Sequence, residues 1–440
     1  MYGVISSTTR KLKKLYGSIS STTREIKKVY GVVGGVTRLI FSDGLVETKW
    51  SGVLYKSNTS DDYYGSLRIL KRTKGSLSVN WNTNISDNSP YVDAVVVSED
   101  GVWCCCVSYS YLTFFKYDGT TMVQTTKLNK TDVINLSGLS GNNSYQKCGL
   151  NSDGSVFFIS LNVGSNTSSY RTVLLFYKNT EGTLSYLSSC VLAQTVIPSS
   201  YPTSSGYTSF AIDLKWNYIA LGAYFYENSY PYECIVRKIL KLNKDFTVTS
   251  LFENSYYFDR DYDFEDGDKN GYIDPNGRYA IIGLKDLEDV GSDYDYYHAQ
   301  SLYYLNNNTV TKSSDNLLNN SRLRKYETPF SSSDGKNLYI QEDSGSGAYS
   351  SSLVCYSCSG ATITKLGSIN IGNYVSRLKE LFTDDIHGFI NYASTENDSN
   401  FYRYFVTFSK DSTGLFTAYT RSGTSCGSDD TAYAFVDREY

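Results

Sequence analysis

Residues 94–103 read Ala-Val-Val-Val-Ser-Glu-Asp-Gly-Val-Trp, which is an apolar run, a polar turn and the start of a second apolar run. β-Branched residues favour strands. The acid and the glycine favour a tight turn, because aspartate caps its own turn and glycine accepts a positive φ. The same unit returns five times along the chain. The copies lie at residues 151–158, 212–219, 273–280, 332–339 and 382–389.

The acids in these turns follow one another at 53, 60, 61, 60 and 50 residues. A strand–turn–strand unit repeated at this distance, with room for four strands, is typical of a β-propeller with long loops. The 42 tyrosines and 20 phenylalanines also favour strands, and the helical period is nearly absent after residue 45. We therefore predict an all-β protein. The turn acids are Asp100, Asp153, Asp213, Asp274, Asp334 and Asp384.

Segments near the two ends of the chain complete a seventh blade. Residues 67–81 resemble an outer hairpin without its inner strands, and residues 431–436 resemble an inner strand without its outer hairpin. Their union would close the ring and remove exposed sheet edges. The sequence thus predicts seven four-stranded blades over residues 43–440, preceded by an arm of residues 1–42. The turn pattern resembles that of bacterial and phage WD-repeat-like propellers, although it has no Trp-Asp signature.

A fourteen-residue unit opens the chain three times. Residues 2–10 recur as residues 16–24 and, more loosely, as residues 30–38. Each copy alternates β-branched and polar residues around Ser-Ser or Gly-Gly, which predicts short strands joined by tight turns. Such strands bury little alone, so they need a partner surface or copies of themselves. We predict an anchoring arm. Its anchoring residues are Tyr2, Arg10, Lys13, Lys14, Tyr16, Arg24, Lys27, Lys28, Tyr30 and Arg38.

The charge of the chain is divided unevenly. Residues 1–40 carry eight basic side chains and one acid, a net charge of +7, so the whole-chain value of −4 leaves −11 on the remainder. A basic arm on an acidic body favours docking to an acidic neighbour. Nucleic acid is a less favoured partner, because the alternating Ile and Val of the arm are typical of strand faces that become buried. A solvated tail is the alternative.

The arm also resembles a known group of sequences. Repeats of the form Tyr-Gly-Ser-x-x-x-x-Thr-Arg/Lys-x-Ile-Lys-Lys are similar to those at the N-terminus of structural proteins of tailed phages that infect gut bacteria. The resemblance implies a virion protein, made in the host cytoplasm, whose N-terminus anchors in the particle. Its partners would be other virion proteins, and it would be oligomeric in the particle. The propeller would decorate the capsid or tail, or would bind a host surface glycan or protein.

One segment has the spacing of a calcium loop. Residues 266–274 fit the pattern D-x-D-x-N-G-x-x-D, in which oxygens at positions 1, 3, 5, 7 and 9 surround the ion. Residue 277 is glycine where an EF-hand would have glutamate, so a helix–loop–helix site is not expected. We predict a structural Ca²⁺ site, with an acidic loop that holds no ion as the alternative. The ligands would be Asp266, Asp268, Asn270, Tyr272 and Asp274.

Two tyrosine-rich segments, residues 224–232 and 293–297, indicate long loops between strands. Tyrosine gives a large contact area and a polar tip at low entropic cost, so it recurs in recognition surfaces. The alternative is that these rings pack between blades. The predicted ligand-binding residues are Tyr224, Tyr226, Tyr230, Tyr232, Tyr294 and Tyr296.

The sequence offers little catalytic chemistry. The only histidines are His298 and His387, and the single Gly-x-Ser-x-Gly match, around Ser425, has no histidine after it. We therefore predict a protein that is not an enzyme. A propeller hydrolase or lyase acting on glycans is the first alternative, and an intracellular scaffold is the second.

The nine cysteines do not form the framework of a secreted protein, because their number is odd and three of them are consecutive. At least one residue of Cys104–Cys106 is expected to pack as a small apolar side chain. We interpret Cys355 and Cys358 as buried structural residues. No signal peptide and no apolar run of about 20 residues is visible, so we expect a soluble chain made in a cytosol.

Overall fold

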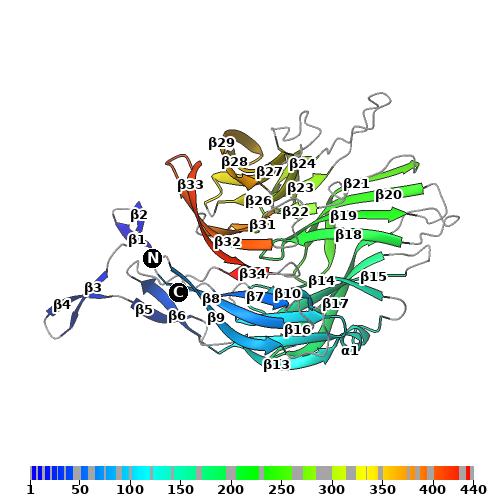
Figure 1. The fold of residues 1–440 in the computed structure, drawn as a ribbon, viewed down its shortest axis with the longest axis horizontal. Helices are drawn as coiled ribbons and strands as arrows, with labels where there is room; N and C mark the ends of the chain where they lie inside the picture. The colour runs from blue at the N-terminus through cyan, green and yellow to red at the C-terminus, as the bar shows by residue number, and fades with distance from the viewer. Residues whose placement is uncertain are drawn as a thin grey trace.

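The chain folds into a ring of seven four-stranded antiparallel sheets preceded by three hairpins (Figure 1). Some strands are described by their backbone alone. The computed structural model describes all residues except 1, 6–7, 12–14, 20–21, 27, 34–35, 43–50, 58–64, 74–75, 86–91, 99–101, 119–121, 140–142, 165–170, 195–204, 227–231, 260–270, 284–299, 314–323, 333, 345–349, 374–376, 382–386, 394–400, 426–432 and 437–440.

Each blade takes four strands in chain order, from the innermost strand to the outermost. Blades 1 to 3 are formed by β10 (Val92–Val97), β11 (Trp103–Ser108), β12 (Tyr111–Tyr117), β13 (Met122–Asn129); β14 (Asn143–Leu150), β15 (Val156–Val163), β16 (Arg171–Thr180), β17 (Thr183–Gln194); and β18 (Ser205–Ile212), β19 (Tyr218–Tyr226), β20 (Tyr232–Leu242), β21 (Val248–Asp259). Blades 4 to 6 are formed by β22 (Gly271–Ile273), β23 (Tyr279–Gly283), β24 (Gln300–Asn306), β25 (Thr309–Lys312); β26 (Arg324–Ser331), β27 (Asn337–Ser344), β28 (Ser350–Ser359), β29 (Thr362–Asn373); and β30 (Arg377–Leu381), β31 (His387–Ala393), β32 (Phe401–Lys410), β33 (Phe416–Ser425).

The seventh blade joins strands from both ends of the chain, as predicted. Its innermost strand β34 (Tyr433–Val436) pairs antiparallel with β7 (Ser51–Ser57), followed by β8 (Gly65–Thr73) and β9 (Ser76–Ile85). The predicted outer hairpin is β8–β9, while β7 is a third N-terminal strand that the sequence analysis missed. Pairing of β34 with β7 gives each strand a hydrogen-bonded neighbour. Without this pair, the inner edge of β7 would be an unpaired sheet edge.

Apolar side chains fill the spaces between successive blades. Consecutive residues of a strand point to opposite faces of the sheet. Phe157 of β15 accordingly packs toward blade 1, against Phe114, whereas Phe158 packs toward blade 3, against Phe210. Both faces of the middle strands are buried, which explains why their sequences are continuous apolar runs rather than alternating ones. Further clusters of this kind lie between blades 3 and 4, 4 and 5, and 5 and 6.

The arm forms three separate hairpins whose registers match. Gly3, Gly17 and Gly31 stand opposite Arg10, Arg24 and Arg38, respectively. The fourteen-residue repeat is therefore a repeat of structure in its paired strands, while the Ser-Ser and Gly-Gly residues lie outside the described residues. None of the six strands pairs with a blade. The strands are β1 (Tyr2–Ile5), β2 (Thr8–Lys11), β3 (Leu15–Ile19), β4 (Thr22–Ile26), β5 (Lys28–Val33) and β6 (Val36–Ser42).

The described part of the chain contains one helix, α1 (Lys130–Asn135), in the connection between blades 1 and 2. It begins at Asn129, whose side chain accepts hydrogen bonds from the backbone N–H groups of Thr131 and Asp132. This short helix is too short to span a bilayer, and the described residues contain no other helix.

Candidate functional site: the two ends of the ring

The two ends of the ring differ in the connections that they carry. At one end, which we call the turn end, short turns join the first strand of a blade to the second and the third to the fourth. At the opposite end, the loop end, the connections from the second strand to the third and from each blade to the next are mostly longer, with short exceptions after β11 and β29. Since β7 is the second strand of its blade, it starts at the turn end. The arm therefore joins the ring at the turn end, through residues 43–50.

The turn after the first strand has one geometry in five blades. The backbone N–H of the residue that opens the turn donates to the carbonyl of the residue five positions later, at the start of the second strand, as from Ser98 to Trp103 and from Asp213 to Tyr218. The side chain of the opening residue also accepts a hydrogen bond from a backbone N–H within the turn. The opening residues are Ser98, Asn151, Asp213, Asp274 and Ser332.

This geometry corrects one alignment made from the sequence. Asp213 and Asp274 open their turns, whereas Asp153 and Asp334 stand two residues further on and bond to the N–H of Ser155 and Lys336. The acids therefore occupy two different positions that look alike in sequence. The glycine of the turn does take a positive φ, as predicted, with +69° at Gly154. The remaining turn acids, Asp100 and Asp384, lie outside the described residues.

Carboxylates at the turn end hold adjacent blades together. Asp274, at the end of β22, accepts hydrogen bonds from the backbone N–H and the hydroxyl of Ser331 in the next blade, at 2.9 and 2.6 Å. Within its own turn it accepts from the N–H of Arg278 at 3.1 Å. The Arg278 guanidinium in turn donates to the carbonyl of Ser332 at 2.6 Å. Burial is the main cause that raises the pKa of Asp274, against these hydrogen bonds.

Asp213 occupies the equivalent place in blade 3. It is fully buried and accepts hydrogen bonds from the backbone N–H groups of Asn217 and Tyr218, at 2.7 and 2.6 Å. Loss of hydration nevertheless outweighs these bonds and raises its pKa to about 6. The turn of blade 4 lies directly against it, since a Cβ on Gly277 would meet Asp213 Oδ2 at 2.8 Å. The raised pKa of Asp213 therefore follows from its burial between the turns of blades 3 and 4.

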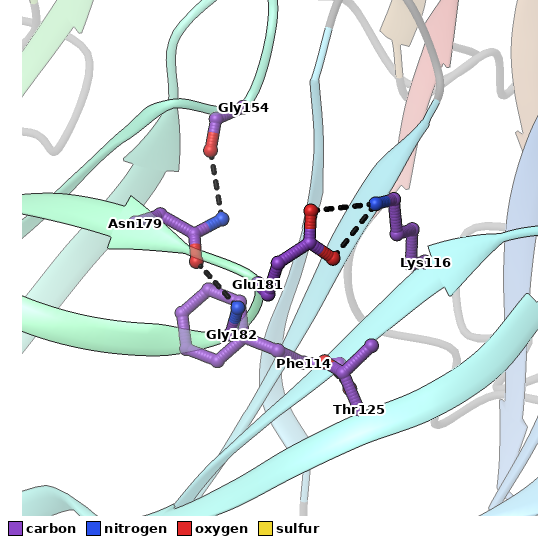
Figure 2. A network of polar contacts seen from close by, with 7 residues as sticks. All are labelled: Phe114, Lys116, Thr125, Gly154, Asn179, Glu181 and Gly182. Atoms are coloured by element: carbon purple, nitrogen blue, oxygen red, sulfur yellow. Dashed lines mark hydrogen bonds and ion pairs between the residues drawn. The ribbon is translucent and has the colours of Figure 1, made fainter.

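Blades 1 and 2 are joined at the turn end by a different set of contacts (Figure 2). The ammonium of Lys116 on β12 lies 2.8 and 2.7 Å from the carboxylate oxygens of Glu181, in the turn between β16 and β17. Within blade 2, the neighbouring Asn179 is buried, donates to the carbonyl of Gly154 at 2.8 Å and accepts from the N–H of Gly182 at 2.9 Å. The turn end is thus built for contact between blades.

Tyrosine hydroxyls reinforce the same contacts in other blades. Tyr218, Tyr279 and Tyr339 donate to the carbonyls of Asn307, Gly360 and Gly414, each in an outer turn of the following blade. These tyrosines pack between blades, which was the alternative interpretation of the tyrosine-rich composition. They also give the buried rings a partner for their polar tips.

The loop end carries a different group of side chains in blades 1 and 2. The ammonium of Lys130 lies 4.7 Å from the ring centroid of Tyr145, on β14, and 5.9 Å from that of Tyr109. It also donates to the carbonyl of Ser108 at 3.1 Å. The ammonium of Lys127 lies 4.2 Å from the ring centroid of Tyr111. We call Tyr109, Tyr111, Lys127, Lys130 and Tyr145 the Tyr–Lys patch.

Lys147 lies on the same strand as Tyr145. Its side chain is exposed as a whole, but its ammonium donates to the carbonyl of Phe210 at 2.9 Å and lies 5.2 Å from the ring centroid of that residue. Loss of hydration lowers the pKa of Lys147. Because Phe210 belongs to the innermost strand of blade 3, this lysine links blades 2 and 3 near the centre of the ring.

The predicted ligand-binding tyrosines fall on blade 3 and blade 4. Tyr224 and Tyr226 lie within β19, and Tyr232 begins β20, so the prediction that they stand in a loop was wrong for these three. Tyr230, Tyr294 and Tyr296 lie outside the described residues. The sequence signal was ambiguous because tyrosine is favoured both in strands and in recognition loops. Their role as ligand contacts stays a prediction.

Two of the predicted calcium ligands lie in the described part of the chain, Tyr272 within β22 and Asp274 directly after it. Tyr272 pairs with Ile281 inside the sheet, and both oxygens of Asp274 accept hydrogen bonds from protein groups at the turn end. Asp266, Asp268 and Asn270 precede β22 and lie outside the described residues. Within the part of the chain that the structure describes, no cluster of three metal-ligating side chains occurs. The calcium site formed by residues 266–274 therefore stays a prediction.

The predicted anchoring residues are distributed over the three hairpins. Tyr2, Tyr16 and Tyr30 lie on the first strand of their hairpins, and Arg10, Arg24 and Arg38 on the second. Lys28 begins β5, while Lys13, Lys14 and Lys27 lie outside the described residues.

The described cysteines form no disulfide, and burial accounts for their chemistry. Cys104, Cys105 and Cys106 are all buried, in line with the expected small apolar role. Cys355 is buried as expected, whereas Cys358 is only half-buried. Burial raises the pKa of Cys355 to about 11 and also raises the pKa of Cys358, so both thiols stay protonated at neutral pH. His387 lies on β31 and Ser425 ends β33, whereas His298 lies outside the described residues.

Comparison with known proteins bears on the fold. No protein-family model and no curated protein matches the sequence. Among solved structures, a protein from Bacteroides fragilis assigned as a 6-phosphogluconolactonase is similar, with 11% identity, a TM-score of 0.52 and coverage of 89% of this chain and 99% of that one. A hypothetical selenium-binding protein from Sulfolobus tokodaii has 9% identity, a TM-score of 0.50 and coverage of 89% and 93%. At such identities the likeness shows the fold alone.

Proposed function

We propose that this chain is a structural protein of a phage particle, in which the arm of residues 1–42 anchors the propeller and the propeller is displayed outward. One observation supports this division above all: the arm joins the ring at the turn end, opposite the loop end. Anchoring by the arm therefore leaves the loop end accessible. The turn end, whose side chains already contact one another across blades, carries the attachment.

The arm itself has the properties of a docking element. Its three hairpins share one register, so each has a Gly–Arg pair at the same position. Each of Arg10, Arg24 and Arg38 stands opposite a glycine and so has no side chain directly across the strand pair. Three equivalent cations on a segment with a net charge of +7 suit an acidic surface of other virion proteins. The resemblance to phage structural proteins points the same way.

The experiment compares the full-length chain with the triple variant Arg10→Glu, Arg24→Glu and Arg38→Glu in co-sedimentation with purified phage particles. We expect the variant to lose at least tenfold in bound protein, because it reverses three cations at equivalent positions. The control is Lys178→Glu, Lys215→Glu and Lys244→Glu, which makes the same change of charge at exposed sites of the ring. Equal binding by both variants, or no binding by the unsubstituted chain, would overturn the proposal.

A further inference from the structure

The Tyr–Lys patch lies at the loop end, on the side of the ring that faces away from the arm. Tyr109 and Tyr111 flank the turn between β11 and β12, and Lys127 and Lys130 stand at the end of β13 and the start of α1. Tyr145 is near the start of β14. The patch thus extends from the middle of blade 1 to the innermost strand of blade 2.

The geometry points to a site that is held in shape before a ligand arrives. The ammonium of Lys130 donates to the carbonyl of Ser108 at 3.1 Å and lies 5.9 and 4.7 Å from the ring centroids of Tyr109 and Tyr145. The backbone N–H of Lys130 also donates to the carbonyl of Ser110 at 2.8 Å. An ammonium held in this way loses little conformational entropy when it meets an anion.

The members of the patch differ in their exposure to solvent. Tyr109 is 78% exposed, which is unusual for so large a ring, and Lys127 is exposed as well. Tyr111, Lys130 and Tyr145 are half-buried. An exposed ring beside ordered ammonium groups offers an apolar face for stacking and positive charge at its edge.

We infer that the Tyr–Lys patch binds an acidic saccharide, in which a sugar ring stacks on Tyr109 and its carboxylate pairs with Lys127 and Lys130. A neutral or apolar ligand would cover the ammonium groups without replacing their hydration, which is costly. Nucleic acid is disfavoured, because its affinity depends on many phosphate contacts and the patch offers only the ammonium groups of Lys127 and Lys130. The inference gives the displayed loop end a ligand, and only its biological setting rests on the proposed function.

A glycan array that carries uronic-acid and sialic-acid saccharides beside their neutral counterparts tests this inference on the full-length protein. We expect binding to acidic saccharides only, and a loss of at least tenfold in the variants Tyr109→Ala and Lys127→Met. Lys130→Met should show the same loss, and Tyr109→Ala should keep the melting temperature because the ring is exposed. The matched controls are Tyr186→Ala and Lys178→Met, two exposed side chains of blade 2 outside the patch.

Three outcomes would overturn the inference: binding of neutral saccharides as strongly as acidic ones, binding unchanged in the patch variants, and no binding to any saccharide. Each can occur with the arm still attached to particles. Failure here is therefore distinguishable from failure of the anchoring proposal, which co-sedimentation measures separately.

Discussion

Asp213 is a carboxyl group that the fold removes from water in order to connect a turn. Its pKa is about 6 in the folded protein and about 4 in an unfolded chain. The folded chain therefore holds the proton more tightly between these values. This contribution to stability is present below about pH 4 and is lost as the pH rises through about 6.

Replacement of Asp213 by asparagine removes this titration and keeps an oxygen that can accept from Tyr218 and Asn217. Between about pH 4.5 and pH 7, the free energy of unfolding of the unsubstituted protein should fall by about 2 kcal/mol more than that of Asp213→Asn. Urea unfolding at the two pH values measures both. An identical pH dependence in the two proteins would show that the carboxyl is not protonated in the folded state.

Aspartate occurs at two different positions of the turn after the first strand, which limited what the sequence could predict about single residues. The turn acids were recognised, but two positions in the turn both favour aspartate, so Asp213 and Asp153 were matched although they do different work. Trp216 shows the converse. It adopts a φ of 55° at the position that glycine takes in other blades, and it is held there by Phe158 and Phe176. The positive φ of Trp216 thus depends on packing with a neighbouring blade, and no local sequence pattern predicts it.

At the scale of single elements, the turn between β16 and β17 separates a buried amide from an exposed ion pair. Asn179→Ala leaves the carbonyl of Gly154 and the N–H of Gly182 without their partner in a buried place, and should lower the free energy of unfolding by about 2–3 kcal/mol. Glu181→Ala removes the ion pair with Lys116. Because the side chains of Lys116 and Glu181 are 38% and 68% exposed, this variant should lower the free energy of unfolding by less than about 1 kcal/mol.

Denaturant unfolding of the two variants tests this order directly. Because the two residues stand in one turn, the comparison keeps the strand pairing and the neighbouring blade the same. A larger loss from Glu181→Ala than from Asn179→Ala would mean that the exposed ion pair between blades 1 and 2 contributes more to stability than the buried amide within blade 2.

Elements were predictable where a local pattern fixes them. The hairpins of the arm follow from alternation around Ser-Ser and Gly-Gly, and β8–β9 follows from a long strand-like run with a central Lys-Gly. β19 was cut short because its final residues, Tyr224–Tyr226, are equally typical of a loop. The Tyr–Lys patch was not predictable, since it joins Tyr109 and Tyr145 across two blades, and only the tertiary packing brings them to one lysine.

At the scale of the whole molecule, the two ends of the ring are not equivalent, because the arm joins only one of them. Closure by β34 and β7 places the start of β7, and with it the arm, at the turn end. The number of blades and their closure were predictable, because the spacing of the turns and the unpaired strands at both termini count the blades without knowledge of their packing. The end of the ring that the arm joins was not predictable, since it depends on which strand of the seventh blade each terminus supplies.

Limited proteolysis of gradient-purified phage particles, followed by mass spectrometry, tests the central claim most directly. Trypsin can cleave after Lys49, between the arm and β7. We predict that the chain is present in the particles, that cleavage releases the propeller, and that peptides of residues 1–42 remain with the sedimented particle. Absence of the chain from the particles, or release of the arm together with the propeller, would contradict the account.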